Sequence, residues 1–182
     1  MMRTISFLAL TGVAFTGSLV AAGFAPALAA DKKPTLIATL KNWSAYSWKT
    51  PDGKVCYAMA KAASTSPEKV KRDPAYIMIN NWPGRKSTGE IQVVPGYLYD
   101  ENVPIKVSVG KLSVDFFAKN DGGAGSAWIK DTADEPKLLD AMRKGSRLTV
   151  TAAARKGGKT QDTYSLAGLG EMVDKARNAC GK

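Results

Sequence analysis

The sequence contains no histidine and only two cysteines, Cys56 and Cys180. Without histidine the chain cannot build a Ser-His-Asp or Cys-His catalytic arrangement, a histidine-ligated metal site or a histidine proton shuttle. Two cysteines so far apart in the sequence do not form a thiolate metal site either. These absences exclude the chemistries just named, and we expect no catalytic residues, no bound metal, no cofactor and no enzymatic activity.

Long apolar runs are missing beyond the first segment. Residues 1–30 combine a basic start at Arg3, an apolar run from Ile5 to Val20 and the small-residue stretch Ala27-Leu28-Ala29. This is the pattern of a cleaved signal peptide, and the alternative is an uncleaved membrane anchor. No later run reaches the roughly 18 apolar residues of a membrane helix. We therefore expect residues 31–182 to form a single domain without a transmembrane segment, located in the periplasm, associated with the outer membrane or secreted.

The two cysteines fit this expected export. Cysteines of an exported protein usually pair, so Cys56 and Cys180 are predicted to form a disulfide. Closing so long a loop stabilises a protein by roughly 4–5 kcal/mol at most in the chain-entropy argument. Free thiols or an intermolecular bridge are the alternatives.

The charge balance is strongly basic, with 26 Lys and Arg against 16 Asp and Glu and a net charge of +10. Export makes nucleic acid an unexpected partner, and lipopolysaccharide phosphates, anionic lipid surfaces, acidic glycans or host-cell surfaces become the expected ones. A solvated surface that serves solubility is the alternative. The candidate binding cations lie around the end of the first predicted helix and beside the loop near residue 157: Arg143, Lys144, Arg147, Arg155, Lys156 and Lys159. They would form one patch if these two connections met at one end of the fold.

A second candidate surface surrounds Trp82 in the stretch NNWPGRK. The two asparagines, the proline and the glycine predict a loop. Arg85 and Lys86 follow directly, and an exposed tryptophan beside cations could dock a sugar ring or lie at a membrane interface. A tryptophan folded back over the edge of the core is the alternative.

Short strands are predicted through most of the chain. In IKVSVGKLSVDF, strict alternation and the Gly110-Lys111 turn pair Val109 with Leu112 and keep six apolar side chains on one face. At Gly157-Gly158 a two-residue turn would mismatch the faces, so we expect a three-residue loop or a bulge. Further strands are predicted at residues 36–40, 43–48, 55–60, 75–80, 90–99, 126–130, 147–154 and 163–168.

Two helices interrupt this pattern. DTADEPKLLDAMRKG has an acidic first turn, an early proline and Gly145 as its end. Near the C terminus, Leu169, Met172, Val173 and Cys180 fall on one helical stripe, so Cys180 is expected on the buried face. The predicted fold is mainly β, an immunoglobulin-like β-sandwich with one short helix before the last strand pair and a C-terminal helix.

Paired carboxylates support a rival function. Asp100-Glu101 and Asp134-Glu135 could supply the two acids of a glycoside hydrolase. Adjacent acids at a turn or in the first turn of a helix are more often solvated. A pocket holding two acids would favour the hydrolase, and a flat basic face with exposed aromatic residues would favour binding.

Seven stretches recur in the order known from one family: CYA at Cys56, RDPAYIMI from Arg72, GY at Gly96, SAWIKD from Ser126, AMRKGSRLTV from Ala141, DTYSLAG from Asp162 and the closing NAC. Together they resemble the invasion-associated locus B family of alpha-proteobacteria over nearly all of the chain after the leader. The resemblance implies an exported, immunoglobulin-like sandwich with a C-terminal helix and no established catalytic residues.

The founding members of that family are linked to entry into host red cells. The present sequence departs from them in TAAARKGGKTQDTYSL, which lacks the Ser and Arg-Gly-Thr that relatives often carry before Asp-Thr-Tyr. The expected function is therefore an exported, non-enzymatic binding module of the envelope or surface, with a contribution to host-cell interaction or invasion as in the founding members. The alternative is a small carboxylate-dependent hydrolase that acts on envelope glycans.

Overall fold

The computed structural model describes residues 33–85 and 87–181. The predicted signal peptide with its cleavage site, and Lys86 of the candidate binding surface, lie outside the described residues. The elements follow one another as β1 (Thr35–Leu40), β2 (Trp43–Thr50), β3 (Gly53–Lys61), β4 (Ser64–Ser66), β5 (Tyr76–Trp82), η1 (Pro83–Arg85), β6 (Ser87–Val94), β7 (Ile105–Val109), β8 (Leu112–Asp121), β9 (Ala124–Ile129), η2 (Thr132–Asp134), α1 (Glu135–Lys144), β10 (Arg147–Ala154), β11 (Gly158–Ser165) and α2 (Leu169–Ala179).

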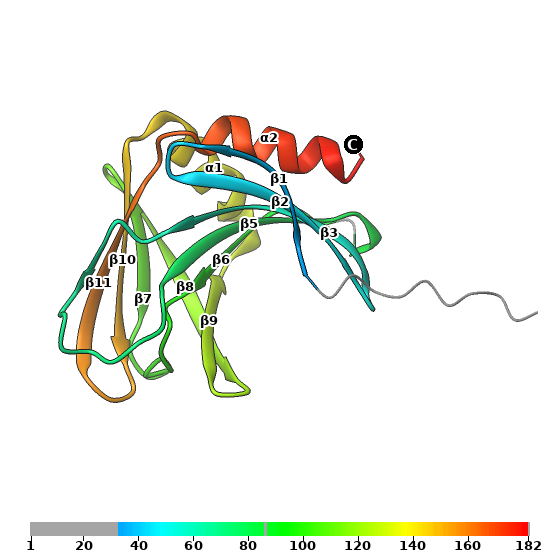
Figure 1. Ribbon diagram of the computed structural model, residues 1–182. Coiled ribbons are helices and arrows are strands. Elements are labelled where there is room, and N and C mark those ends of the chain that lie inside the picture. The colour runs from blue at the N-terminus through cyan, green and yellow to red at the C-terminus, as the bar shows by residue number, and fades with distance from the viewer. Residues whose placement is uncertain (1–32, 86, 182) are drawn as a thin grey trace, which may run out of the picture.

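The strands of the described chain form one antiparallel sheet in the order β1-β2-β3-β5-β6-β9-β8-β7-β10-β11-β4. Its two halves join through a short pairing of β6 with β9, and they run in different directions (Figure 1). Only Ala62 and Ala63 separate β3 from β4, so one run of chain contributes to both halves. Apolar side chains from both halves, such as Ile79 and Val150, share a single buried core. The prediction of a mainly β, sandwich-like fold is confirmed.

The two hairpin predictions are also confirmed. Val109 pairs with Leu112, as the Gly-Lys turn requires. In the last hairpin Ala154 pairs with Gly158, which leaves a three-residue loop at 155–157. This loop restores the face match, because each inward residue of β10 now opposes an inward residue of β11.

Two local predictions differ from the structure. The strand expected to reach residue 99 ends at Val94, because Pro95 cannot donate a backbone hydrogen bond and Gly96 follows with a φ of +77°. The loop expected around Trp82 begins later than predicted, because β5 continues past Asn80, the end of the predicted strand, through Asn81 to Trp82, and both asparagines are buried. Both side-chain NH₂ groups donate inside the sheet: Asn80 Nδ2 donates to Glu90 and Gln92, and Asn81 Nδ2 donates to the Cys56 carbonyl at 3.2 Å. The short strand β4 was not predicted.

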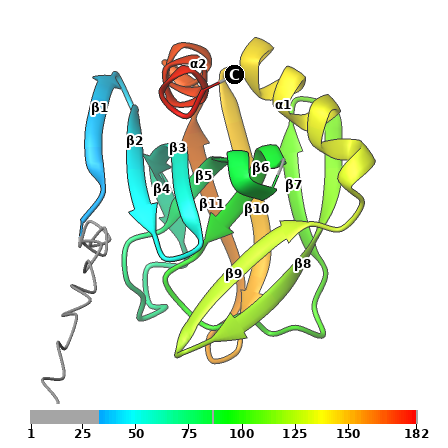
Figure 2. The same cartoon turned by 90° about the vertical axis from the view of Figure 1, so that its right-hand side faces the viewer.

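Both predicted helices are present, and they cover one edge of the sandwich. α1 begins at Glu135, ends before Gly145 and buries Leu138 and Met142. α2 lies across β1, β2 and β3, and it buries Leu169, Met172, Val173 and Ala176 (Figures 1 and 2). Gly168 precedes α2 with a φ of +94°, and a Cβ there would lie 2.3 Å from the Leu40 carbonyl oxygen. None of the helices in the described part of the chain is long and apolar enough to cross a membrane.

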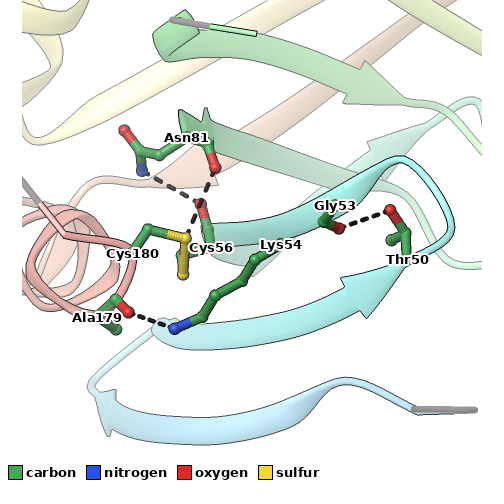
Figure 3. The surroundings of a disulfide bond; sticks show 7 residues. All are labelled: Thr50, Gly53, Lys54, Cys56, Asn81, Ala179 and Cys180. Carbon is green, nitrogen blue, oxygen red and sulfur yellow. Dashed lines mark hydrogen bonds between the residues drawn. A yellow bond between two sulfur atoms is a disulfide. The ribbon is translucent and has the colours of Figure 1, made fainter. Parts of the chain in front are cut away.

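The predicted disulfide between Cys56 and Cys180 fastens α2 to the sheet. Cys56 lies in β3 and is fully buried, and Cys180 caps the C-terminal end of α2 (Figure 3). The Cα atoms of the two cysteines are 5.7 Å apart across a sequence separation of 124 residues. Lys54 Nζ donates to the Ala179 carbonyl at 2.6 Å, so the same strand also satisfies one of the last carbonyls of the helix.

We predict that Cys180→Ser loosens α2 without unfolding the sheet. The two cysteines are 124 residues apart in the sequence, and the loss of such a closure costs roughly 4–5 kcal/mol at most. Amide hydrogen exchange should become faster from Leu169 to Ala179 while the amides of β5 keep their protection. Intact mass should rise by two hydrogens when the wild type is reduced. Unchanged exchange in α2 would show that helix packing alone holds it.

Candidate functional site

A basic pocket lies where the β10–β11 loop meets the segment after Pro95. It has a volume of about 350 Å³ and is lined by Lys71, Tyr97, Leu98, Ala154, Arg155 and Lys156. The Arg155 backbone N–H donates to the Leu98 carbonyl at 2.8 Å, which fixes the loop against this segment. Within residues 33–85 and 87–181 no acidic side chain forms an ion pair with any of the three cations. The basic pocket can therefore accept an anion.

A buried ion pair lies beside the basic pocket. Arg72 Nη2 donates to Asp162 Oδ1, and the two side chains are only 9% and 2% exposed. The Arg72 guanidinium lies 4.9 Å from the centre of the Tyr97 ring. The hydroxyl groups of Tyr97 and Thr160 are hydrogen-bonded at 2.6 Å. One wall of the basic pocket is thus tied to the core through a chain of polar contacts.

The electrostatics of this pair reflect its burial. Desolvation raises the pKa of Asp162 to about 6, against the opposing effect of the Arg72 charge and hydrogen bond. Burial likewise raises the pKa of Tyr97, partly offset by its hydrogen bond with Thr160. Asp162 is consequently ionised at neutral pH and faces a cation. Sequence reasoning missed this pair, although RDPAYIMI and DTYSLAG each contain one partner.

The structure does not bring the six predicted cations into one patch, because Lys144 and Arg147 line one hollow and Arg155 and Lys156 line another. All six are exposed, but Arg147 begins β10 and Arg155 follows its end, roughly 25 Å away at the usual rise per residue. Figure 1 shows the β10–β11 loop at the end of the hairpin far from α1. Arg143 is paired with Asp174 at 2.7 Å, and Lys144 with Asp140 at 2.7 Å. The predicted set therefore separates into a largely neutralised group near α1 and a free group at the loop.

Trp82 and Arg85 lie on a different surface. Trp82 is the last residue of β5 and is half-buried, so it is neither free in a loop nor inside the core. The Arg85 guanidinium lies 4.6 Å from the centre of its ring and is paired with Asp52 at 3.0 Å. Both residues line an open groove of about 590 Å³, the aromatic groove, which also contains Glu90, Gln92, Phe117, Lys119, Trp128, Ile129, Thr132 and Glu135.

Two of the predicted carboxylates line a hollow together with another acid: Asp134 lies with Asp115 and Asp131 in one hollow, and Glu135 lies in the aromatic groove. Asp100 accepts hydrogen bonds from Asn102, Glu101 accepts one from Asn120, and Asp134 is paired with Lys137. Glu135 lines the aromatic groove together with Glu90. Burial and the nearby Glu90 charge raise the pKa of Glu135. Glu90 was not predicted, although its alternation with the buried Ile91 indicates an outward side chain.

Metal chemistry finds no support in the described chain. In residues 33–85 and 87–181 no three His, Cys, Asp or Glu residues are grouped so that they could hold a metal ion.

Comparisons with known proteins agree with the fold and with the sequence resemblance. A family model described as invasion associated locus B (IalB) protein matches residues 43–177. Among solved structures, the crystal structure of invasion associated protein B from Bartonella henselae is similar, with 14% sequence identity and a TM-score of 0.56. The match covers 81% of this chain and 100% of that chain, and at this identity it bears on the fold alone. No curated protein matches the sequence.

We predict that Asp162→Ala lowers the free energy of unfolding by about 3–5 kcal/mol at neutral pH, because it leaves the Arg72 charge buried and unpaired. The double variant Arg72→Met, Asp162→Leu should lose less than the sum of the losses in its two single variants, Arg72→Met and Asp162→Leu. Asp115→Ala, which removes an exposed pair with Lys106, should change stability little. Urea unfolding checks all of these variants. Additive losses would mean that the ion pair contributes no coupling.

Proposed function

This chain belongs to the invasion-associated locus B family, and we propose that it is an exported, non-enzymatic module that binds anionic polymers of the bacterial envelope or of a host-cell surface. Export is supported by the predicted signal peptide and by the disulfide, because disulfides persist in oxidising compartments. The proposed location is the periplasm, with association with the outer membrane or secretion as further steps. The proposal includes a role in host-cell interaction, because a host-cell surface is one of the anionic surfaces that the protein would bind.

The basic pocket carries this proposal. Lys71, Arg155 and Lys156 line one hollow and form no ion pair in the described chain. Convergent unpaired cations attract phosphate or sulfate groups, and the attraction weakens as salt screens it. Lys159 is exposed on β11 next to the same loop and adds to the positive potential. The buried ion pair beside the pocket keeps its wall in place when a ligand binds.

We predict that replacing Lys71, Arg155 and Lys156 by Gln weakens binding to lipopolysaccharide and to phosphatidylglycerol vesicles by about 100-fold. The reason is that each cation near an anionic surface contributes about 1 kcal/mol. Titrations at low and at physiological salt measure the effect, and the wild-type affinity should fall steeply with salt. Binding to lipopolysaccharide but not to the vesicles would identify the polymer rather than the lipid surface as the source of the phosphates.

A matched variant separates the pocket from the overall charge. Arg143, Lys144 and Arg147 can be replaced by Gln in the same way, and this removes the same number of charges from the other end of β10. Its affinity should fall much less, because two of these cations already face a carboxylate. Equal losses in the two triple variants would contradict a specific pocket and leave only net charge.

A carboxylate-dependent hydrolase of envelope glycans is the second candidate function, and one observation favours it. Glu90 and Glu135 line the same groove, and the pKa of Glu135 is raised. Two carboxyl groups in one groove, one of them with a raised pKa, are the kind of pair that glycoside hydrolases use.

Because we propose a binding module, we predict that the wild type releases no reducing ends from peptidoglycan beyond the level of Glu135→Gln. A reducing-sugar assay over several hours measures this. Release by the wild type that is lost in Glu135→Gln would instead establish the hydrolase.

A further inference from the structure

The aromatic groove is built on one face of four neighbouring strands, β5, β6, β9 and β8. Gln92 pairs with Trp128, and Trp128 pairs with Phe117, so these three side chains form a row across the sheet. Successive side chains alternate between the faces of a strand, and the buried Ile91 and Val93 therefore leave Gln92 on the outer face. An aromatic row on the outer face of the sheet does not contribute to the core.

The rings of this row are ordered and accessible. Phe117 and Trp128 stack with their centroids 6.0 Å apart, and Phe117 is 46% exposed. Trp82 lies at the edge of the same groove, where the Arg85 guanidinium lies against its ring. Arg85 is in turn held by Asp52. The aromatic surface is thus formed before any ligand arrives, which lowers the entropy cost of binding.

Polar groups frame the aromatic row. Asn80 Nδ2 donates to Glu90 Oε1 at 3.3 Å and to Gln92 Oε1 at 3.1 Å. Gln92 Nε2 donates to Ser126 Oγ at 3.2 Å. Asn80 is almost completely buried, so it orients Glu90 and Gln92 from within the sheet. The second Glu90 oxygen and the Glu135 carboxyl group can accept further hydrogen bonds from a ligand.

The charges that line the groove do not favour the anionic ligands proposed for the basic pocket. Arg85 and Lys119 supply two positive charges, and Glu90 and Glu135 supply two negative ones. An anionic polymer would meet the two carboxylates, and a fully apolar partner would have to bury four charged groups at a high desolvation cost. The groove suits an uncharged ligand that has one apolar face and a rim of hydroxyl groups.

We propose that the aromatic groove binds an uncharged sugar ring, whose C–H face stacks on Trp128 and Phe117 and whose hydroxyl groups donate to Glu90 and Gln92. The groove volume of about 590 Å³ falls within the range of small-ligand sites. None of its lining residues lines the basic pocket, so this sugar site is independent of the anion-binding function proposed above. The chain would then hold a glycan through two chemically different contacts.

Titration calorimetry with two uncharged probes, the tetramer of N-acetylglucosamine and the tetramer of glucose, tests the sugar site. The wild type should bind at least one of them saturably, with an affinity that does not change between low and physiological salt. Trp128→Ala and Phe117→Ala should each weaken that binding by about tenfold, because each removes a stacking surface. Trp48→Ala, at an exposed tryptophan outside the groove, should leave it unchanged.

Several results would overturn the sugar site. Neither tetramer binding the wild type would do so, and so would binding that Trp128→Ala and Phe117→Ala leave intact. Because Phe117 is exposed, its variant keeps the test valid if Trp128→Ala does not fold. The Gln variant of Lys71, Arg155 and Lys156 should bind the tetramers as the wild type does, so a failure of the sugar site and a failure of the basic pocket are distinguishable.

Discussion

The buried ion pair between Arg72 and Asp162 is the contact on which the arrangement of the candidate binding surface depends. Arg72 belongs to the irregular segment between β4 and β5, and Asp162 belongs to β11, so the pair fastens a segment with few backbone hydrogen bonds to the sheet. Removal of either partner would leave the other charge buried and unpaired, which strongly destabilises the fold. Since Tyr97 packs on the guanidinium, the same contact sets one wall of the basic pocket.

The stretches that carry the family resemblance meet one another in the folded chain. RDPAYIMI meets DTYSLAG through Arg72 and Asp162, and it meets GY where the Asp73 N–H donates to the Gly96 carbonyl at 2.8 Å. CYA meets NAC in the disulfide. These stretches therefore hold the scaffold together. The cations of the β10–β11 loop, Arg155, Lys156 and Lys159, lie outside these stretches.

The two candidate surfaces differ in charge because they are built from different parts of the fold. The basic pocket uses a hairpin loop and irregular segments, where long cationic side chains stay solvated without disturbing packing. The aromatic groove uses a regular sheet face, where alternation and cross-strand pairing place Gln92, Trp128 and Phe117 in a row, and α1 adds Glu135 at its edge. A glycan with phosphate groups could contact both.

Sequence alone determined the features that rest on local rules. Alternation predicted the hairpin at Val109 and Leu112, and helical spacing predicted Cys180 at the end of a docked helix. The disulfide with Cys56 was predicted because the cysteines of exported proteins usually pair. The tertiary structure decided which distant residues meet. It joined Glu90 to Glu135 in one groove and separated the cations at the two ends of β10, because strand order in a sheet depends on packing among elements far apart in the sequence, which no local pattern encodes.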